Sequence, residues 1–136
     1  MIKGFWNEYR KFKLRCRGAT IGKNCYINGH VRVINPKYLV IKDNVSINHN
    51  VLISCIKTVY IKDNTHISPA VQIHTGSLNR NRKHKFSSII IGKNVWIGSG
   101  AIICIGSIID DNTTIPALTT VRKHDYYTPD KYILEV

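Results

Sequence analysis

The sequence predicts an all-β fold, a parallel β-helix of about five triangular turns, and three observations indicate it. An Ile or Val recurs at intervals of six residues from position 21 to position 121. A small or β-branched residue precedes most of these markers by two positions, so both side chains face the same side of a strand. The spacing exceeds six only after a third marker, at 33 to 41, 53 to 61 and 73 to 91. Each turn therefore has three flat sides.

The first element is a helix expected within residues 1–18. Five apolar residues recur there at helical spacing: Ile2, Phe5, Trp6, Tyr9 and Phe12. Basic residues fill many of the positions between them. Such a helix would serve as a cap that closes the open end of the coil. Because basic amphipathic helices also bind anionic lipid, peripheral membrane contact through this helix is the alternative interpretation.

The coil itself is expected over residues 19–123. At the first corner of each turn the sequence reads IGKN, IKDN, IKDN, IGKN and IDDN. Gly and Asn tolerate the left-handed backbone conformation that a tight corner requires. The last residues of these corners should therefore stack as a ladder: Asn24, Asn44, Asn64, Asn94 and Asn112.

One side of the coil should carry an outward-facing apolar stripe. The stripe residues lie one position before the first marker of four successive turns: Val40, Tyr60, Ile90 and Ile108. A flat apolar stripe on a slender coil is typical of an interface between protein chains. We therefore expect several copies of the chain to assemble.

A long basic loop, residues 74–90, interrupts the coil at the last corner of its third turn. The regular spacing of apolar residues stops there, and two histidines, His74 and His84, lie among lysines and arginines. Imidazole is the side chain whose ordinary pKa suits proton transfer near neutral pH. The loop is therefore where we expect acid–base chemistry.

Charge and cysteine content narrow the class of protein. A net charge of +12 over 136 residues favours anionic ligands. No recognition helix or zinc-finger pattern accompanies that charge, so we expect no nucleic acid partner. The four cysteines form no CxxC pair, which argues against a metal site and favours a reducing cytoplasm. The N-terminus lacks the apolar core of a signal peptide, which also points to a cytoplasmic protein.

The chain resembles a known family most specifically between residues 89 and 123. The stretch IIIGKNVWIGSGAIICIGSIIDDNTTIPALTTVRK is similar to the C-terminal coils of sugar and capsule O-acetyltransferases. These relatives of galactoside, maltose and serine acetyltransferases are left-handed parallel β-helices built from hexapeptide repeats. The left hand comes from this resemblance, since general crossover rules favour right-handed connections. The resemblance also implies acetyl-CoA as the acyl donor and a homotrimer whose active sites lie between subunits.

Carried over residue by residue, the resemblance implies a site in the last two turns. Ser99 matches the residue whose backbone N–H faces the acyl oxygen, an oxyanion donor. The other matches are an aromatic at the mouth of the site, small residues beside the pantetheine arm, and cations for the phosphates of coenzyme A. In that order they are Trp96; Gly98 and Ala117; and Arg122 and Lys123.

The catalytic base is where this chain departs from the family. The family histidine usually ends a T-G-S-H string five residues after the third marker, and Leu78 occupies that position here. His84 is the first substitute, because its place near the end of the loop resembles that of the serine acetyltransferase histidine. His74, directly after the marker, is the second. A hydroxyl acceptor benefits greatly from such a base, whereas a neutral amine can attack without one.

The sequence therefore predicts an acetyl-CoA-dependent O-acetyltransferase that acts on a sugar or polysaccharide of the capsule or lipopolysaccharide type. One alternative is a sugar-nucleotide N-acetyltransferase that needs no histidine base. The other is a noncatalytic β-helix that binds acidic glycan in a basic groove. Residues 124–136 resemble the exit segment of the family and are expected to form a C-terminal tail.

Overall fold

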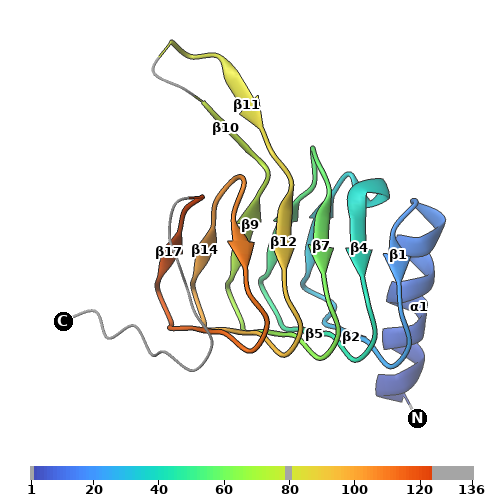
Figure 1. Cartoon of the computed structure of the whole chain (residues 1–136). Coiled ribbons are helices and arrows are strands. Elements are labelled where there is room, and N and C mark those ends of the chain that lie inside the picture. The colour runs from blue at the N-terminus through green and yellow to red at the C-terminus, as the bar shows by residue number, and fades with distance from the viewer. Residues whose placement is uncertain (1, 79–80, 124–136) are drawn as a thin grey trace.

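The computed structural model describes residues 2–78 and 81–123, and the tail expected over 124–136 lies outside the described residues. Figure 1 shows a prism of stacked turns with one helix at its N-terminal end and one hairpin that projects from it. The helix, α1, spans Ile2–Cys16. The described chain thus runs from a helix into a coil, as the apolar spacing predicts.

Three parallel five-stranded sheets form the sides of the prism, and each sheet takes one strand from every turn. The first sheet comprises β1 (Thr20–Ile21), β4 (Leu39–Ile41), β7 (Val59–Ile61), β12 (Ile89–Ile91) and β15 (Ile108–Ile109). The second comprises β2 (Tyr26–Ile27), β5 (Ser46–Ile47), β8 (His66–Ile67), β13 (Trp96–Ile97) and β16 (Thr114–Ile115). The third comprises β3 (Arg32–Ile34), β6 (Leu52–Ser54), β9 (Gln72–His74), β14 (Ile102–Ile103) and β17 (Thr120–Val121). The predicted β-helix is confirmed.

The core is a single column of side chains inside the prism. Every marker from Ile21 to Val121 is buried, and the residues two positions earlier are buried as well, except for Val31, which is half-buried. Buried hydroxyl groups in the column form hydrogen bonds within the prism. Thr65, for example, donates to the Gly92 carbonyl oxygen at 2.7 Å. Removing this apolar column from water supplies the main attraction between successive turns.

Successive sides meet at three corners. The first corner is formed by residues 22–25, 42–45, 62–65, 92–95 and 110–113. The second is formed by residues 28–31, 48–51, 68–71, 98–101 and 116–119, and the third by residues 35–38, 55–58, 75–88 and 104–107. A short 3-10 helix, Pro36–Tyr38, lies in the third corner of the first turn.

The asparagine ladder is confirmed at the first corner. All five residues have left-handed backbone conformations, with φ between 54° and 60°: Asn24, Asn44, Asn64, Asn94 and Asn112. Aspartates of the next turn accept from the backbone beside them, as when the Lys23 N–H donates to Asp43 at 2.8 Å and the Lys93 N–H donates to Asp111 at 2.7 Å. The corner residues therefore join one turn to the next.

The segment expected as the loop 74–90 contains more regular structure than the sequence suggested. β9 includes His74 and β12 begins at Ile89. Between them β10 (Gly76–Leu78) and β11 (His84–Phe86) pair as an antiparallel hairpin. The Ser87 N–H donates to the Thr75 carbonyl oxygen at 2.9 Å and closes the base of this hairpin. The hairpin then projects away from the prism (Figure 1).

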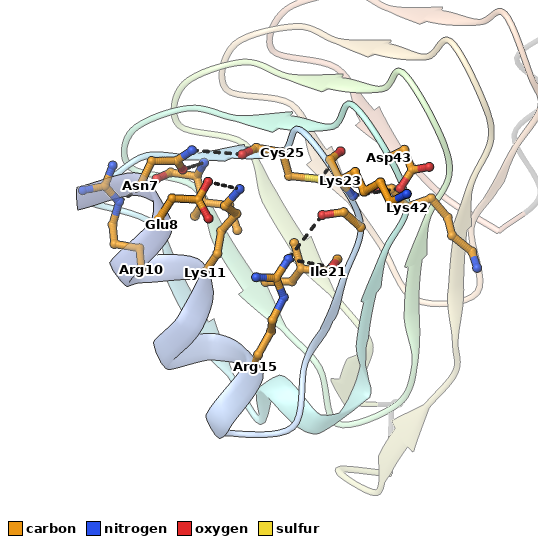
Figure 2. Close-up of polar contacts among 12 residues, drawn as sticks. Asn7, Glu8, Arg10, Lys11, Arg15, Ile21, Lys23, Cys25, Lys42 and Asp43 are labelled. Carbon is orange, nitrogen blue, oxygen red and sulfur yellow. Dashed lines mark hydrogen bonds and ion pairs between the residues drawn. The ribbon is translucent and has the colours of Figure 1, made fainter. Parts of the chain in front are cut away.

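Helix α1 lies across the N-terminal end of the prism, beside β1 and β2 (Figure 1). Polar side chains of α1 bond to the backbone of the first turn (Figure 2), and Leu14 packs against the core. Asn7 donates to the Cys25 carbonyl oxygen at 3.0 Å and accepts from the Ile27 N–H at 2.9 Å. Arg10 donates to the Ile27 carbonyl oxygen at 2.6 Å, and Arg15 donates to backbone oxygens of β1 and the first corner.

The face that α1 turns toward the coil differs from the expectation. A hydrophobic plug would place the aromatic side chains against the first turn, yet all four are exposed: Phe5, Trp6, Tyr9 and Phe12. Backbone groups at the open edge of the sheets need hydrogen-bond partners, and side chains such as Asn7 and Arg10 supply them. No helix in the described part of the chain is long and apolar enough to cross a membrane.

Candidate active site

Two turns meet tightly at the second corner, where Ser99 was expected to act. The Leu118 N–H donates to the Ser99 carbonyl oxygen at 2.9 Å, and the Gly98 N–H donates to the Ile115 carbonyl oxygen at 2.7 Å. A Cβ added at Gly98 would lie 2.5 Å from the backbone nitrogen of Ala117. Gly98 is therefore required for close packing of these two turns, a reason that the sequence resemblance did not supply.

The backbone N–H of Ser99 is the oxyanion donor that the resemblance implies. Ser99 is exposed, and the described residues provide no hydrogen-bond partner for its N–H. An exposed N–H held by a rigid corner can donate to a developing negative charge on a bound group. The corner that holds it is fixed by Gly98 and Ala117, so the structure brings these three residues together.

Trp96 lies on the outer face of the second sheet, just before this corner. The indole is more than half exposed, and its Nε1–H donates to the Ser68 hydroxyl at 2.9 Å. His66 pairs with Trp96 on the neighbouring strand, and the two rings meet edge to face with centroids 5.9 Å apart. A shallow depression of about 420 Å³ adjoins them. Trp96 is therefore fixed in place while its face remains accessible.

His66 lies on the outer face of β8, one turn below Trp96. Its Nδ1 lies 2.5 Å from the Ser46 hydroxyl oxygen, and its Nε2 lies 3.3 Å from the Asn48 amide nitrogen. With both ring nitrogens engaged by neighbours, His66 positions the wall below Trp96. Neither Ser46, on β5, nor Ser68, which is buried at the second corner, was singled out from the sequence, because an isolated serine carries no signal until its neighbour is known.

Leu118 forms part of the outer surface of the second corner. It has a left-handed backbone conformation, with φ of 62°, which is strained for a bulky side chain. Its side chain lies over Gly100, where an added Cβ would be 2.7 Å from the Leu118 Cδ2. Leu118 is 81% exposed, so any group that binds at this corner would have to pass beside its side chain.

Arg122 and Lys123 follow β17 at the start of the third corner, and both are exposed. The Lys123 side chain runs beside Gly106, where an added Cβ would be 3.1 Å from the Lys123 Cδ. Ser87, at the base of the hairpin, borders the same glycine. The two cations therefore lie near the root of the hairpin, and they could hold phosphate groups by charge-assisted hydrogen bonds.

His84 is the first residue of strand β11 in the hairpin. It pairs directly with Leu78, the residue at the family histidine position. Residues directly opposite each other on antiparallel strands project from the same face, so the imidazole and the leucine are neighbours. The ring is exposed and stacks on Phe86, with centroids 5.8 Å apart and an interplanar angle of 1°. Phe86 in turn covers Gly76.

His74 lies at the end of β9, where the third side reaches the third corner. Its Nε2 is 2.9 Å from the Gln72 side-chain oxygen, so one ring nitrogen is already engaged as a donor. Thr75 beside it is buried, donates to the Ser54 carbonyl oxygen at 2.7 Å and accepts from the Ile56 N–H at 2.9 Å. This anchored threonine fixes the direction in which the hairpin leaves the coil.

One chain does not bring all the expected site residues together. Ser99 lies at the second corner, whereas His84 and Lys123 belong to the third, and one six-residue side of about 20 Å separates the corners. The paired strands β10 and β11, which carry His84, project away from the prism, whose second corner carries Ser99 (Figure 1). Within one chain, the two groups of expected residues therefore lie apart.

Comparison with known proteins places this arrangement in a class. No family model matches the chain. It is 29% identical over 119 residues, 85% of its length, to a protein of Escherichia coli K12 named as the colanic acid biosynthesis acetyltransferase WcaF. The chain spans about 65% of the length of that curated relative.

Solved structures share the fold. A maltose O-acetyltransferase from Clostridium difficile 630 superposes with a TM-score of 0.80 at 30% identity, over 85% of this chain and 65% of its own. A galactoside acetyltransferase in complex with coenzyme A superposes with a TM-score of 0.68 at 25% identity, over 94% of this chain and 78% of its own. The chain belongs to the hexapeptide-repeat acyltransferase family of left-handed parallel β-helices.

Proposed function

We propose that this chain is an acetyl-CoA-dependent O-acetyltransferase that acts on a sugar or polysaccharide acceptor of the capsule or lipopolysaccharide type. The observation that carries the proposal is the second corner, where an exposed Ser99 N–H adjoins Trp96 on turns locked by Gly98 and Ala117. Relatives named for colanic acid biosynthesis and for maltose and galactoside acetylation support the acceptor class.

The proposed residues divide the reaction between them. The imidazole of His84 removes the proton from the acceptor hydroxyl, whose oxygen bonds to the acetyl carbonyl carbon. The Ser99 N–H donates to the carbonyl oxygen as negative charge develops there. The carbon–sulfur bond of the thioester then breaks, and the proton passes from His84 to the departing thiolate. Arg122 and Lys123 hold the phosphates of the acyl donor.

A homotrimer with shared sites is part of the proposal. The second and third corners of one chain carry different parts of the site, so corners of two chains must meet to complete it. The apolar stripe supports the contact surface, since its members align in register on the first sheet: Val40, Tyr60, Ile90 and Ile108. The stripe is partly exposed in the isolated chain.

Light scattering should therefore give about three times the chain mass of 15.5 kDa at micromolar concentration. Ile108→Glu, at a stripe position that is 64% exposed, should dissociate the assembly and abolish activity, because a charge would be buried in the contact. Ile102→Glu on the third sheet is the matched control and should leave the mass unchanged. A fully active monomer would contradict the shared site.

The proposed phosphate contacts can be tested by calorimetry. Arg122→Ala combined with Lys123→Ala should weaken coenzyme A binding by about 1–3 kcal/mol, because two charge-assisted hydrogen bonds are lost. Lys23→Ala combined with Lys93→Ala removes the same charge from exposed positions at the first corner and should change the affinity little. Equal losses in both double variants would indicate a general effect of net charge and remove this phosphate site.

N-acylation is the second function that a specific observation favours. Leu78, 59% exposed, occupies the position of the family base, and a neutral amine acceptor would not require one. Release of coenzyme A thiol with amino-sugar acceptors but with no hydroxyl acceptor would favour this alternative. A protein that binds acidic glycan but releases no thiol with either acceptor class would match the noncatalytic alternative.

The proposal also includes the cellular location of the protein and its contact with a membrane surface. We place the protein in the cytoplasm, which is supported by four cysteines that are all free thiols. Burial raises the pKa of the Cys55 thiol to about 12, so that side chain acts as part of the core and not as a nucleophile. Peripheral contact with a membrane surface through α1 also belongs to the proposal, supported by the outward aromatic face of that helix.

A further inference from the structure

The outward face of α1 is strongly apolar for a surface helix. Phe5, Trp6 and Phe12 are 64%, 49% and 61% exposed, and Tyr9 lies between them at 45%. The spacing places all four side chains on the side opposite Asn7, which contacts the coil. The rings also contact one another, since the Trp6 ring is 5.5 Å from that of Phe5 and 6.1 Å from that of Tyr9.

The aromatic face cannot be accounted for as a misplaced part of the core. The coil side of α1 is already filled by Leu14, by the Asn7 contacts and by Lys11, which is 4% exposed. The Lys11 ammonium bonds to the Glu8 carboxylate at 2.7 Å, and this hydrogen bond lowers the pKa of the Glu8 carboxyl. Rotating the helix to bury the aromatics would break these contacts and the bonds to the sheet edge.

A basic groove runs along the same helix. It has a volume of about 480 Å³ and lies between α1 and the first turn, around β3. Four cationic side chains line it, and none of the described residues that line it is acidic: Arg10, Lys13, Arg17 and Arg32. The bond from Arg10 to the Ile27 carbonyl oxygen uses one of the five guanidinium N–H groups. The groove therefore offers several donors and uncompensated positive charge to an anion.

We infer that α1 docks the N-terminal end of the coil on an anionic phospholipid surface. The four aromatic side chains enter the boundary between headgroups and acyl chains, where amphipathic rings are favoured. The cations of the basic groove meet lipid phosphates, and the net charge of +12 strengthens the attraction. The combination of an outward aromatic face and a groove without acidic residues favours a lipid surface over a purely apolar partner.

The geometry gives this docking an orientation. Because α1 lies across the end of the prism, the coil axis points away from the lipid surface (Figure 1). The hairpin then leaves the third turn, about 10 Å above the first turn on which α1 packs, and Ser99 lies in the fourth turn, about 15 Å above it. In the proposed trimer, three parallel coils would present three helices to one surface, and multivalency would strengthen the binding. The inference deepens the proposed membrane contact and does not depend on the acyl transfer chemistry.

Sedimentation with lipid vesicles tests the inference on the full chain. We expect binding to vesicles containing about a quarter phosphatidylglycerol to be at least about 10-fold tighter than binding to phosphatidylcholine alone. Trp6→Ser combined with Phe12→Ser should lower the binding at least about 10-fold, because the inserting side chains are lost. Leu118→Ser, which removes an 81% exposed side chain at the opposite end of the coil, is the matched control and should bind normally.

Charge reversal tests the groove separately. Lys13→Glu combined with Arg17→Glu should abolish the preference for phosphatidylglycerol, whereas Lys23→Glu combined with Lys93→Glu, with the same change in net charge, should retain most of it. An equal loss in both double variants would overturn the groove as the phosphate site. Coenzyme A binding, measured by calorimetry, should persist in the α1 variants, so a failure here is distinct from a failure of the proposed enzyme.

Tryptophan fluorescence provides a second measurement that needs no disruptive change. Emission of the wild-type protein should shift to shorter wavelength on phosphatidylglycerol vesicles, and Trp6→Phe, which leaves Trp96, should lose the shift. Absence of vesicle binding by the wild type would overturn the inference. It would also be overturned if Trp6→Ser with Phe12→Ser reduced the oligomer mass without any vesicle effect, since α1 would then be a contact between copies of the chain.

Discussion

Replacing His84 by Ala is expected to cut turnover with a sugar hydroxyl acceptor by about 100-fold or more, while coenzyme A affinity stays nearly unchanged. The expectation follows from the hairpin, which pairs His84 with Leu78 and so sets an imidazole beside the position that the family histidine would occupy. The ring stacks on Phe86 and is exposed. It is therefore oriented yet accessible to an acceptor. Initial rates at saturating acetyl-CoA would measure the loss.

Two further variants separate the possible bases. His74→Ala should reduce turnover little, because the His74 ring already bonds to Gln72 at the edge of the coil. Leu78→His combined with His84→Ala should restore part of the lost activity, since the new imidazole lies directly across the hairpin from the one removed. Loss of activity in His74→Ala with His84→Ala unaffected would move the base to the corner. If both single variants are fully active, histidine catalysis is contradicted and an amine acceptor becomes the better account.

The repeating part of this protein can be read from its sequence because its structure is local and periodic. Each Ile or Val marker reports one inward position, and each corner asparagine reports one left-handed residue, as Asn64 and Asn94 illustrate. A neighbouring turn repeats the same environment, so no distant contact is needed to fix the register. The outward stripe was predicted from the same spacing, and in the structure two of its members, Tyr60 and Ile90, pair in register.

The parts without a repeat could not be predicted in this way. For α1, the apolar spacing correctly indicated a helix, but its orientation depends on unpaired backbone oxygens at the edge of the sheets, such as that of Cys25. These backbone groups need hydrogen-bond partners, and Asn7 and its neighbours supply them. This need determined the orientation of α1, whereas the hydrophobic pattern did not. The hairpin at 76–86 carries few apolar residues, so its pairing follows from the anchored Thr75 and from Phe86 packed on Gly76, which sequence spacing does not reveal.

Gly98→Ala is expected to lower the free energy of unfolding by about 3 kcal/mol. Its new Cβ would lie 2.5 Å from the Ala117 nitrogen and 2.8 Å from the Ala117 Cα, so one backbone turn must move against another. Gly29→Ala, at the second corner of the first turn, is the matched control: its Cβ would meet the Arg10 side chain no closer than 3.5 Å. Chemical denaturation of both variants measures the difference, and an equal, small effect would contradict the tight packing at Gly98.

The same substitution tests whether the active site is shared, when assayed below its melting temperature. Moving the corner displaces the Ser99 N–H, so Gly98→Ala should lose activity while retaining His84. Co-expression with His84→Ala should then restore about a quarter of wild-type activity, because random mixing places an intact corner against an intact hairpin at about one contact in four. Each variant alone remains inactive, so the recovered activity can arise only where corners of two chains meet. No recovery in mixed assemblies of normal mass would mean that both parts of the site act within one chain.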